Sequence, residues 1–415
     1  MKVIYNIGLL AGIQPEGVLR VSGADQARTG VLENAWIALE DGRIVDFGEI
    51  SPRAPLGRND NIVIPSETVI PSEVEESLDA RGGMVIPGFC DSHTHVVYAG
   101  SRDGEFLDKI RGLSYEEIAA RGGGILNSAD LLHRTSEDEL YEQSMVRVRE
   151  MMDKGTVAME IKSGYGLNPA DELKMLRVIR RIRETVPACV KSTFLGAHAI
   201  GRGYTHEEYV QAVIDMIPAA AEYADFIDVF CDEGFFTVED TDRILRAAEH
   251  LLTPKIHANE LAVSGGVQVG VQHKALSVDH LEQTTDAEIE ALRDTWTMPT
   301  FLPGSSFFLG LPYGRARNFL QAGLGIALAS DYNPGSSPSG DMRFVMALAC
   351  IKMKLTPIEA FNAVTLNSAY AMGISSEYGS ITRGKRAALL LTTPGWDLTK
   401  LAYQYQTPFL REVIR

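Results

Sequence analysis

The sequence predicts an α/β protein, a (β/α)8 TIM-like barrel with a small β-sandwich domain formed by both ends of the chain. Two observations carry this prediction. Between about residues 84 and 375, apolar runs of strand length alternate with helical stretches in eight units, which is the pattern of an α/β barrel. Both chain ends instead hold short β-type runs separated by turn residues. A doubly wound open sheet stays an alternative, because strand counting from one sequence does not exclude it.

The chain ends are expected to form the small domain. Residues 35–48 hold two β-rich runs around Asp41-Gly42, which predicts a hairpin because Asp-Gly suits a tight two-residue turn. The segment 51–80 is rich in Pro, Ser, Asn and Glu, so we expect an irregular surface excursion there. The apolar run 387–391 is expected to pair with the early strands. The predicted domains are therefore 1–82 with 376–415 for the small domain and 83–375 for the barrel.

The barrel prediction depends on eight apolar, β-type runs separated by longer helical patterns. The expected strands are residues 84–90, 156–161, 189–195, 226–230, 254–257, 275–278, 297–302 and 325–329. Among the expected helices are residues 170–185, 207–222, 237–252 and 286–294.

Composition excludes several classes of function. The chain has 415 residues, 45% of them hydrophobic, and a net charge of −16, which disfavours a nucleic-acid or anionic-membrane surface. The four cysteines are far apart and form no CxxC pair, so neither a disulfide framework nor a cysteine zinc site is expected. The N-terminus lacks the apolar region of a signal peptide, and no apolar run approaches the ~20 residues of a membrane span. We expect a cytoplasmic, soluble protein.

A pair of histidines follows the first expected strand of the barrel. In Asp91-Ser92-His93-Thr94-His95 the two imidazoles are two residues apart, and alternate side chains of an extended chain point to the same side. His93 and His95 are therefore placed to hold one cation, and imidazole ligands suit zinc, iron or nickel. Taken alone, the segment also fits two polar loop residues, since nine histidines in 415 residues fall two apart by chance in some chains.

Titratable residues also follow other expected strands. In an α/β barrel the C-terminal strand ends face one mouth, where active sites are built. Side chains from five strands would therefore meet in one pocket, a coincidence that separate structural roles do not explain. The residues are His93 and His95 after the first strand, His198 after the third, His257 and Glu260 after the fifth, His280 after the sixth and Asp331 after the eighth.

These residues resemble the metal-dependent amidohydrolase superfamily, and the longer motifs resemble its imidazolonepropionase family. The resemblance runs from about residue 87 to 340 and weakens toward both ends. DSHTH alone would indicate only the superfamily, whereas the set of motifs is specific to the family. The motifs are PGFCDSHTHVVYAGSRDGEF, RGGGI, EIKSGYGL, STFLGAHA, HANE, DHLE, LPGSSFFL and SDYNPGSSP.

The resemblance implies a catalytic metal site. One metal ion, zinc or iron, would be bound by three imidazoles and one carboxylate, which leaves a coordination position for water. The metal would lower the pKa of that water and produce hydroxide at neutral pH. Asp331 would also accept the proton of the water through its second oxygen, and His280 and Glu260 would shuttle protons. The implied metal ligands are His93, His95, His257 and Asp331.

The resemblance also implies a substrate with a propionate group. Arg102 would clamp its carboxylate bidentately, and His198 would polarise the substrate carbonyl. Glu260 would also contact a ring N–H of the substrate. Tyr165, Asn333, Gly335 and Ser336 would supply further polar contacts to the substrate.

The family pattern implies one metal rather than two. Binuclear relatives use a carboxylated lysine at the fourth strand, and here that strand ends in Cys231-Asp232-Glu233. Lys162 follows the second strand instead, so we do not expect it to bridge two metals.

The resemblance implies hydrolysis of the ring C–N amide bond of 4-imidazolone-5-propionate, giving N-formimidoyl-L-glutamate in histidine degradation. A homodimer is also implied. A mononuclear-metal ring deaminase is the nearest alternative, because the His257-x-x-Glu260 spacing also occurs there, but a neutral base would give Arg102 no anion to bind. A barrel without catalysis, kept as a binding module, is the second alternative, and such proteins tend to lose metal ligands that are all present here.

Overall fold

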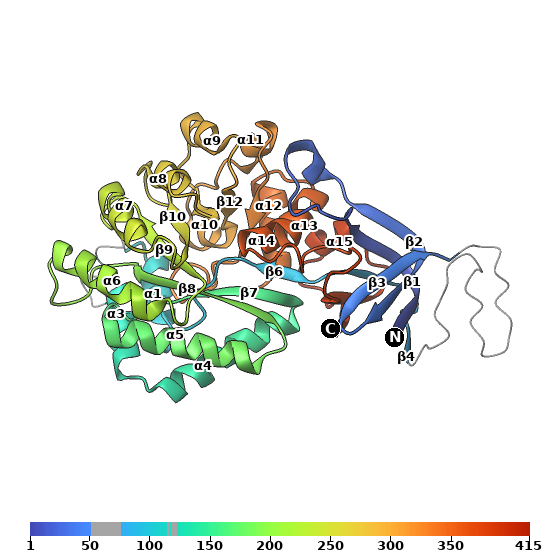
Figure 1. The fold of residues 1–415 in the computed structure, drawn as a ribbon, viewed down its shortest axis with the longest axis horizontal. Coiled ribbons are helices and arrows are strands. Elements are labelled where there is room, and N and C mark those ends of the chain that lie inside the picture. The colour runs from blue at the N-terminus through green and yellow to red at the C-terminus, as the bar shows by residue number, and fades with distance from the viewer. Residues whose placement is uncertain (51–75, 114–116, 118–122) are drawn as a thin grey trace.

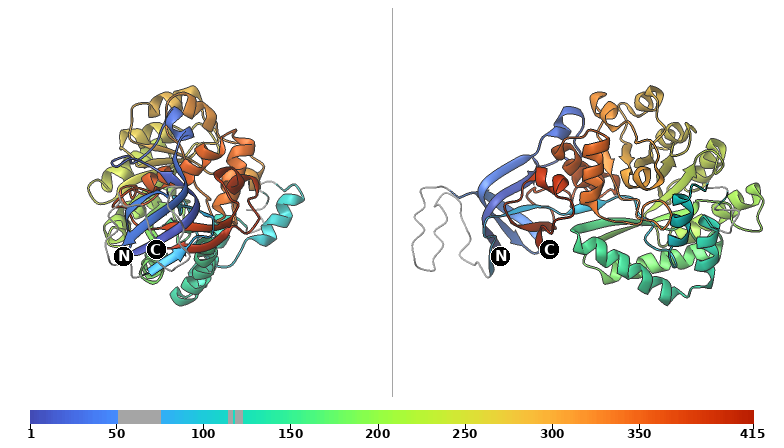
Figure 2. Two further views of the ribbon diagram at one scale, coloured as in Figure 1. Left: turned by 90° about the vertical axis from the view of Figure 1, so that its right-hand side faces the viewer. Right: turned by 180° about the vertical axis from the view of Figure 1, so that it is seen from behind.

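The computed structural model describes residues 1–50, 76–113, 117 and 123–415. The molecule is elongated, with a barrel ringed by helices at one end and a β-sheet at the other (Figure 1). Both chain termini lie at the sheet, which the view from behind also shows (Figure 2). The fold is therefore the predicted TIM-like barrel with an extra sheet from the chain ends.

Eight parallel strands form the barrel in sequence order. Its circle closes where the chain after the last strand meets the chain after the first. There the Asp331 N–H donates to the His93 carbonyl at 3.0 Å, and the His95 N–H donates to the Tyr332 carbonyl at 2.9 Å. The strands are β6 (Phe89–Asp91), β7 (Thr156–Lys162), β8 (Cys189–Ala197), β9 (Phe226–Cys231), β10 (Thr253–Ala258), β11 (Ser277–His280), β12 (Met298–Phe301) and β13 (Ala327–Leu328).

The expected helices are present, and caps explain where they begin. The Thr205 hydroxyl accepts the backbone N–H of Glu208 while the Glu208 carboxylate accepts the Thr205 N–H, a capping box that starts α6. The stretch expected at 237–252 ends earlier, at Ala247, and His250 beyond it is left-handed with φ 67°. The helices are α1 (Asp103–Ile110), α3 (Ile125–Arg134), α4 (Glu137–Asp153), α5 (Pro169–Thr185), α6 (His206–Ala220), α7 (Val238–Ala247), α8 (Gly266–Gln272), α9 (Asp286–Leu292), α10 (Pro303–Leu309), α11 (Ala316–Gln321), α12 (Met342–Lys352), α13 (Pro357–Val364), α14 (Leu366–Ala371) and α15 (Leu398–Tyr403).

The chain ends pair in one seven-stranded sheet, so the predicted sandwich is a single sheet over its own apolar core. The expected hairpin is confirmed, with positive φ angles at Asp41 and Gly42 as a tight primed turn requires. The strand order is β15-β14-β5-β1-β2-β3, and β4 pairs with β1. The strands are β1 (Lys2–Ile13), β2 (Gly30–Glu40), β3 (Arg43–Glu49), β4 (Glu76–Asp79), β5 (Gly83–Pro87), β14 (Leu389–Pro394) and β15 (Leu410–Ile414).

Two local expectations differ from the structure. The run expected as one strand at 84–90 divides at Gly88: β5 pairs antiparallel with β14 in the end sheet, and β6 begins the barrel. A Cβ at Gly88 would lie 2.3 Å from Val157, so this crossing needs glycine. Residues 76–79 form a strand rather than an irregular excursion, and 51–75 lie outside the described residues. The domain division at 82/83 stays a prediction. The strand β5, which directly follows this division, pairs in the end sheet.

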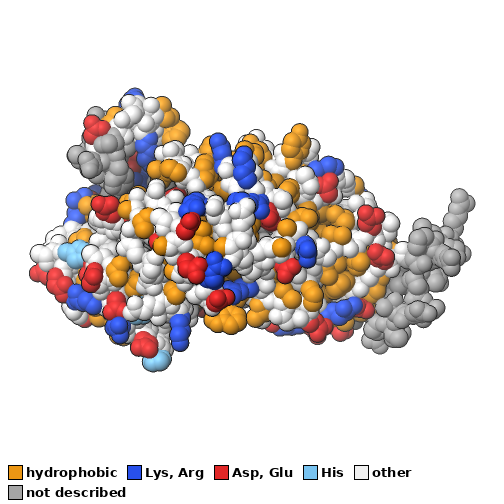
Figure 3. All heavy atoms as spheres, turned by 90° about the horizontal axis from the view of Figure 1, so that it is seen from above, with side chains coloured by type: hydrophobic (Ala, Val, Ile, Leu, Met, Phe, Trp, Pro, Cys, Tyr) orange, Lys and Arg blue, Asp and Glu red, His pale blue; other side chains and the backbone are white. Residues whose placement is uncertain are grey.

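The described surface mixes both signs of charge. On the face shown in Figure 3, Lys and Arg side chains alternate with Asp and Glu and with apolar groups. Within the described residues, every helix is too short or too polar to cross a bilayer.

A short 3-10 helix, η1 (Gly23–Ala27), ties the N-terminal part of the chain to the barrel. The buried Gln26 amide donates to the Ile326 carbonyl at 3.0 Å and accepts the Ile326 N–H at 2.9 Å. It also donates to the Glu359 carbonyl at 3.2 Å. This side chain therefore satisfies the Ile326 N–H just before β13, which burial would otherwise leave unpaired, and shares the Ile326 carbonyl with the Asn367 amide.

Replacing this amide tests its contribution to stability. We expect Gln26→Ala to lower the free energy of unfolding by about 1–3 kcal/mol, because it leaves the buried Ile326 N–H without a partner. Denaturant unfolding measures the change, with Gln211→Ala at an exposed position as the matched control. Equal stability of the two variants would contradict the assignment.

Candidate active site

A cavity of about 720 Å³ opens at the C-terminal ends of the barrel strands. Aromatic side chains, including Phe230 and Phe308, share its wall with titratable groups. Of the twelve residues predicted for the site, eleven line this cavity, and the twelfth, His93, is buried and contacts His95. The eleven are His95, Arg102, Tyr165, His198, His257, Glu260, His280, Asp331, Asn333, Gly335 and Ser336.

The closure of the barrel brings four buried donors together. The Nε2 atom of His95 lies 3.2 Å from Nε2 of His93 and 3.4 Å from Nε2 of His257. Oδ1 of Asp331 lies 3.6 Å from Nε2 of His93 and 3.5 Å from Nε2 of His95. Residues at the ends of β6, β10 and β13 thus each contribute one ligand atom to this cluster, and His95 contributes the fourth.

These spacings fit a cation. Four ligands at zinc bond lengths of about 2.0–2.2 Å lie roughly 3.3–3.6 Å apart when arranged as a tetrahedron. Four of the six separations among these atoms, at 3.2 to 3.6 Å, match that figure, and His93, His95 and Asp331 form one group of possible metal ligands. The residues present therefore suit a divalent metal ion.

The imidazoles of this cluster are in the form that binds a metal. Burial lowers the pKa of His93 and of His95 well below the usual range, and it lowers the pKa of His257 to about 3. All three rings are therefore neutral at pH 7. A neutral imidazole offers one unprotonated nitrogen, which is what a metal requires.

The second carboxylate oxygen of Asp331 has a hydrogen-bond partner, although the sequence predicts it to be free. Its Oδ2 accepts a hydrogen bond from the Ser305 hydroxyl of α10, and the Ser336 hydroxyl lies 3.4 Å away. The oxygen expected to be open for a proton is thus already an acceptor. Asp331 also has a left-handed backbone, with φ 53°, a strained conformation of the kind found at functional sites.

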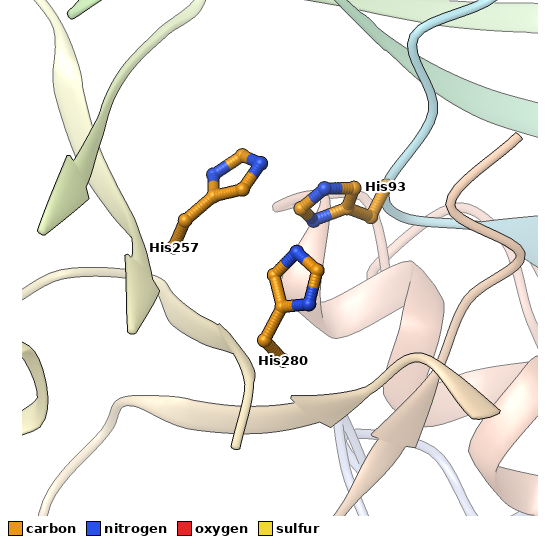
Figure 4. A group of neighbouring side chains, drawn as sticks. All are labelled: His93, His257 and His280. Carbon is orange, nitrogen blue, oxygen red and sulfur yellow. The ribbon is translucent and has the colours of Figure 1, made fainter. Parts of the chain in front are cut away.

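His280 and Glu260 lie next to each other beside the cluster. His280 Nε2 lies 3.7 Å from a Glu260 oxygen, and its Nδ1 lies 3.5 Å from Glu282. Burial raises the pKa of Glu260 to about 7, with His280 opposing and Glu282 adding to the rise. Burial alone would lower the pKa of His280, but the two glutamates raise it well above the usual value. Figure 4 shows the His280 ring turned toward those of His93 and His257, and these three also form a group of possible metal ligands.

His198 is oriented as an acceptor. Its Nδ1 lies 3.0 Å from the Gly164 carbonyl, so Nδ1 carries the hydrogen, and burial lowers its pKa to about 4. Nε2 of the neutral ring is then unprotonated. The expected polarisation of a substrate carbonyl needs a donor, so the orientation instead favours accepting an N–H. Gly164 is required here, since a Cβ would lie 2.8 Å from His198 Nδ1, and Tyr165 packs 5.5 Å from the His198 ring.

Two cations meet beside Gly335 at the cavity wall. Arg102 bonds Glu105 through Nε at 2.8 Å and Nη2 at 2.6 Å, and its Nη1 lies against Gly335, where a Cβ would be 2.3 Å away. Lys109, one turn along α1 from Glu105, donates to the Gly335 carbonyl at 2.6 Å and stands over the Phe308 ring. The arginine is therefore partly neutralised, and the lysine is a second positive group that sequence reasoning missed.

The loop after Asp331 is held by its own side chains. The Asn333 Oδ1 accepts the N–H groups of Gly335 and Ser336, both at 2.8 Å. Its Nδ2 donates to the Asp331 carbonyl and to the Ser336 hydroxyl, both at 2.7 Å. Asn333 thus shapes the loop that carries Gly335 rather than presenting an unused amide to the cavity.

Lys162 is engaged in ion pairs in the barrel interior. Its Nζ lies 2.6 Å from Glu160 and 2.8 Å from Asp228. Burial alone would lower the pKa of Lys162, but Asp228 and Glu160 raise it. The lysine is therefore a cation and unsuited to carboxylation.

Sequence reasoning missed several residues that contact the predicted ones. Some signal was present: Asp279 directly precedes His280, and Glu282 lies two residues beyond it. Others approach from distant segments, for which a single sequence holds no signal. The missed residues are Glu105, Lys109, Asp228, Asp279, Glu282 and Ser305.

Comparison with known proteins identifies close relatives. The chain is 50% identical over 411 residues to the imidazolonepropionase of Christiangramia forsetii, covering 98% of this chain and 96% of that one. It is 47% identical to the imidazolonepropionase of Flavobacterium johnsoniae, covering 100% and 98%. The amidohydrolase family model matches residues 243–409.

Solved structures share the fold at low identity. An adenosine deaminase from Xanthomonas campestris with bound zinc superposes with a TM-score of 0.68 at 15% identity, covering 97% of this chain and 88% of that one. The guanine deaminase of E. coli has a TM-score of 0.65 at 16% identity, covering 98% and 93%. These likenesses extend over both the barrel and the end sheet.

The four-donor cluster predicts how metal content depends on one histidine. We expect His257→Ala to lower bound metal from about one ion per chain to a small fraction, because a three-donor site loses affinity steeply. Elemental analysis of the dialysed protein measures the metal. His250→Ala, at a side chain 90% exposed, is the control, and equal metal content in both variants would contradict the assignment.

Proposed function

Because the chain belongs to the imidazolonepropionase family of amidohydrolases, we propose that it hydrolyses the ring C–N amide bond of 4-imidazolone-5-propionate to N-formimidoyl-L-glutamate. The observation that carries this proposal is the joint placement, in one cavity, of a four-donor cluster, a proton-carrying pair and two cations. A hydrolase of a cyclic amide needs the donor cluster and the proton-carrying pair, and binding of a propionate side chain needs the two cations.

The four donors His93, His95, His257 and Asp331 would hold the metal ion. When bound, the ion supplies a Lewis acid that activates water and stabilises negative charge on the carbonyl oxygen. The cluster is buried at the end of the cavity wall formed by His95, His257 and Asp331, so the reacting amide is directed there and bulk water is limited.

Proton transfer is assigned to His280 and Glu260. Attack of water on the ring carbonyl releases one proton and leaves a ring nitrogen that must gain one. His280, which its raised pKa keeps protonated at neutral pH, lies 3.7 Å from Glu260 and favours the ionised form of that carboxyl, so Glu260 can receive the proton of the water. Glu260, with a pKa of about 7, is suited to donate it to the departing nitrogen near neutral pH. One water is consumed, and the C–N bond breaks without any redox change.

Substrate orientation is assigned to the opposite wall and to His198. Nη1 of Arg102 and Nζ of Lys109 both lie against Gly335, so the propionate carboxylate bridges them. His198 accepts a ring N–H through Nε2, and Tyr165 covers the ring beside it. The propionate chain then spans the cavity between the cations and the four donors.

Three further properties belong to this proposal. The metal is zinc or iron, since three imidazoles and one carboxylate suit both. The protein is a homodimer and acts in the cytoplasm on a small molecule, without nucleic acid or membrane. Elemental analysis and light scattering of the purified chain test the first two.

The activity is tested by the ultraviolet absorbance of freshly prepared imidazolonepropionate. We expect rapid loss of the imidazolone band with the metal-loaded chain, and a kcat lower by about 10²- to 10⁴-fold for Glu260→Gln, because the donated proton is lost. Glu233→Gln, on an exposed glutamate, is the control. Loss no faster than the spontaneous rate would exclude this substrate, and ammonia release from ring bases would then favour a deaminase.

The two cations predict a selective effect on substrate binding. We expect Arg102→Met and Lys109→Met each to raise KM by at least tenfold while kcat changes little, because a charge-assisted hydrogen bond to the carboxylate is worth about 1.5–3 kcal/mol. Lys352→Met, at an exposed end of α12, serves as the control. An unchanged KM for both variants would place the carboxylate elsewhere.

A further inference from the structure

The barrel interior beneath the cavity holds five ionisable residues that line no part of it. We call them the floor network: Glu160 and Lys162 on β7, Asp228 on β9, Lys255 on β10 and Asp279 on β11. Each is at most 1% exposed. Barrel interiors are normally packed with branched apolar residues, and an apolar replacement of a buried ion network is often as stable. Stability alone therefore does not account for five charges here.

The two aspartates of the floor network reach the metal-binding histidines from below. Asp279 Oδ2 lies 2.7 Å from Nδ1 of His93, and Asp228 Oδ2 lies 2.8 Å from Nδ1 of His257. Asp228 also accepts the backbone N–H of His257 at 3.0 Å. The Nδ1 of His93 is hydrogen-bonded to Asp279, whereas the Nδ1 of His257 contacts Asp228 at 2.8 Å without the alignment of a hydrogen bond. A carboxylate at either distance favours hydrogen on Nδ1, which leaves each Nε2 unprotonated toward the four-donor cluster.

The lysines and Glu160 hold those aspartates in place. Lys162 Nζ lies 2.8 Å from Asp228 and 3.7 Å from Asp279. Lys255 Nζ lies 3.8 Å from Asp279 and donates to the Ser92 carbonyl at 2.9 Å. Both ammonium groups also contact Glu160, Lys162 at 2.6 Å and Lys255 more closely. Each member of the floor network thus has at least one oppositely charged neighbour.

The network also has a charge surplus. Three carboxylates face two ammonium groups, so one negative charge is unbalanced within the floor network. It lies on the side of His93 and His257, because Asp279 and Asp228 are the members in contact with those rings. A negative charge just beyond a neutral ligand makes the ligand a better donor to a cation.

We propose that Asp279 and Asp228 are positioning residues of the metal site: they fix the protonated nitrogen of His93 and His257, and Lys162, Lys255 and Glu160 hold them in register. The inference rests on the metal site assigned above but not on the identity of the substrate. It explains why charges replace apolar residues on four strands of the barrel.

The test measures metal binding without substrate. The full chain is stripped with a chelator and titrated with zinc against a chromophoric chelator, and the visible spectrum of the cobalt(II)-loaded protein reports ligand geometry. We expect Asp279→Asn to weaken zinc binding by about 10- to 100-fold and to shift the cobalt bands. Asp242→Asn removes a matched carboxylate 2.8 Å from the surface residue His273 and should leave both unchanged.

A double variant separates positioning from stability. Asp279→Asn/Lys255→Met removes one charge of each sign, so the net charge of the floor network stays that of the unaltered chain. We expect it to recover thermal stability relative to Asp279→Asn but not zinc affinity, and Asp228→Asn to weaken zinc binding independently. Recovery of affinity with stability, unchanged zinc affinity in the single variants, or failure of all variants to fold would each overturn the proposal. Absence of imidazolone hydrolysis by the unaltered chain would bear only on the proposed function.

Discussion

The site depends on the few hydrogen bonds that close the barrel. Strands β6 and β13 are the shortest neighbours in the ring, and the backbone pairs His93–Asp331 and His95–Tyr332 continue the sheet beyond them. These bonds place an imidazole pair and a carboxylate within 3.6 Å of one another. The same bonds that complete the fold therefore also assemble the donors.

A second constraint is the cost of burying charge. In water the donors and the carboxylates beneath them would be solvated, whereas inside the barrel each needs a partner. The chain provides these partners in sequence. The lysines pair with the aspartates, the aspartates contact the histidines, and the histidines lie in the four-donor cluster. An unbound cluster of neutral nitrogens beside a carboxylate is strongly disposed to take up a cation. Burial is thus what gives the site its affinity as well as its shape.

Much of this arrangement was predictable from the sequence, because the carboxyl ends of barrel strands meet by geometry. Knowing that His257 and Asp331 end strands is enough to place them at one mouth. Three kinds of detail were not predictable. The strand break at Gly88 depends on a steric contact with Val157, the Ser305 bond to Asp331 joins separate units, and the direction of the His198 ring depends on a carbonyl of another loop. Each of these details arises from packing between distant segments, which the local sequence pattern does not predict.

The passage of the chain from β5 into β6 has a thermodynamic consequence. Only Gly88 separates a central strand of the end sheet from the strand that leads to His93, so no flexible linker insulates the two units. A ligand that binds the folded barrel alone stabilises it by about 2.7 kcal/mol when present at 100 times its Kd. Because β5 continues directly into β6, this stabilisation free energy also applies to the end sheet. Cation occupancy and the cohesion of the chain ends are therefore linked, although the two lie at opposite ends of the molecule.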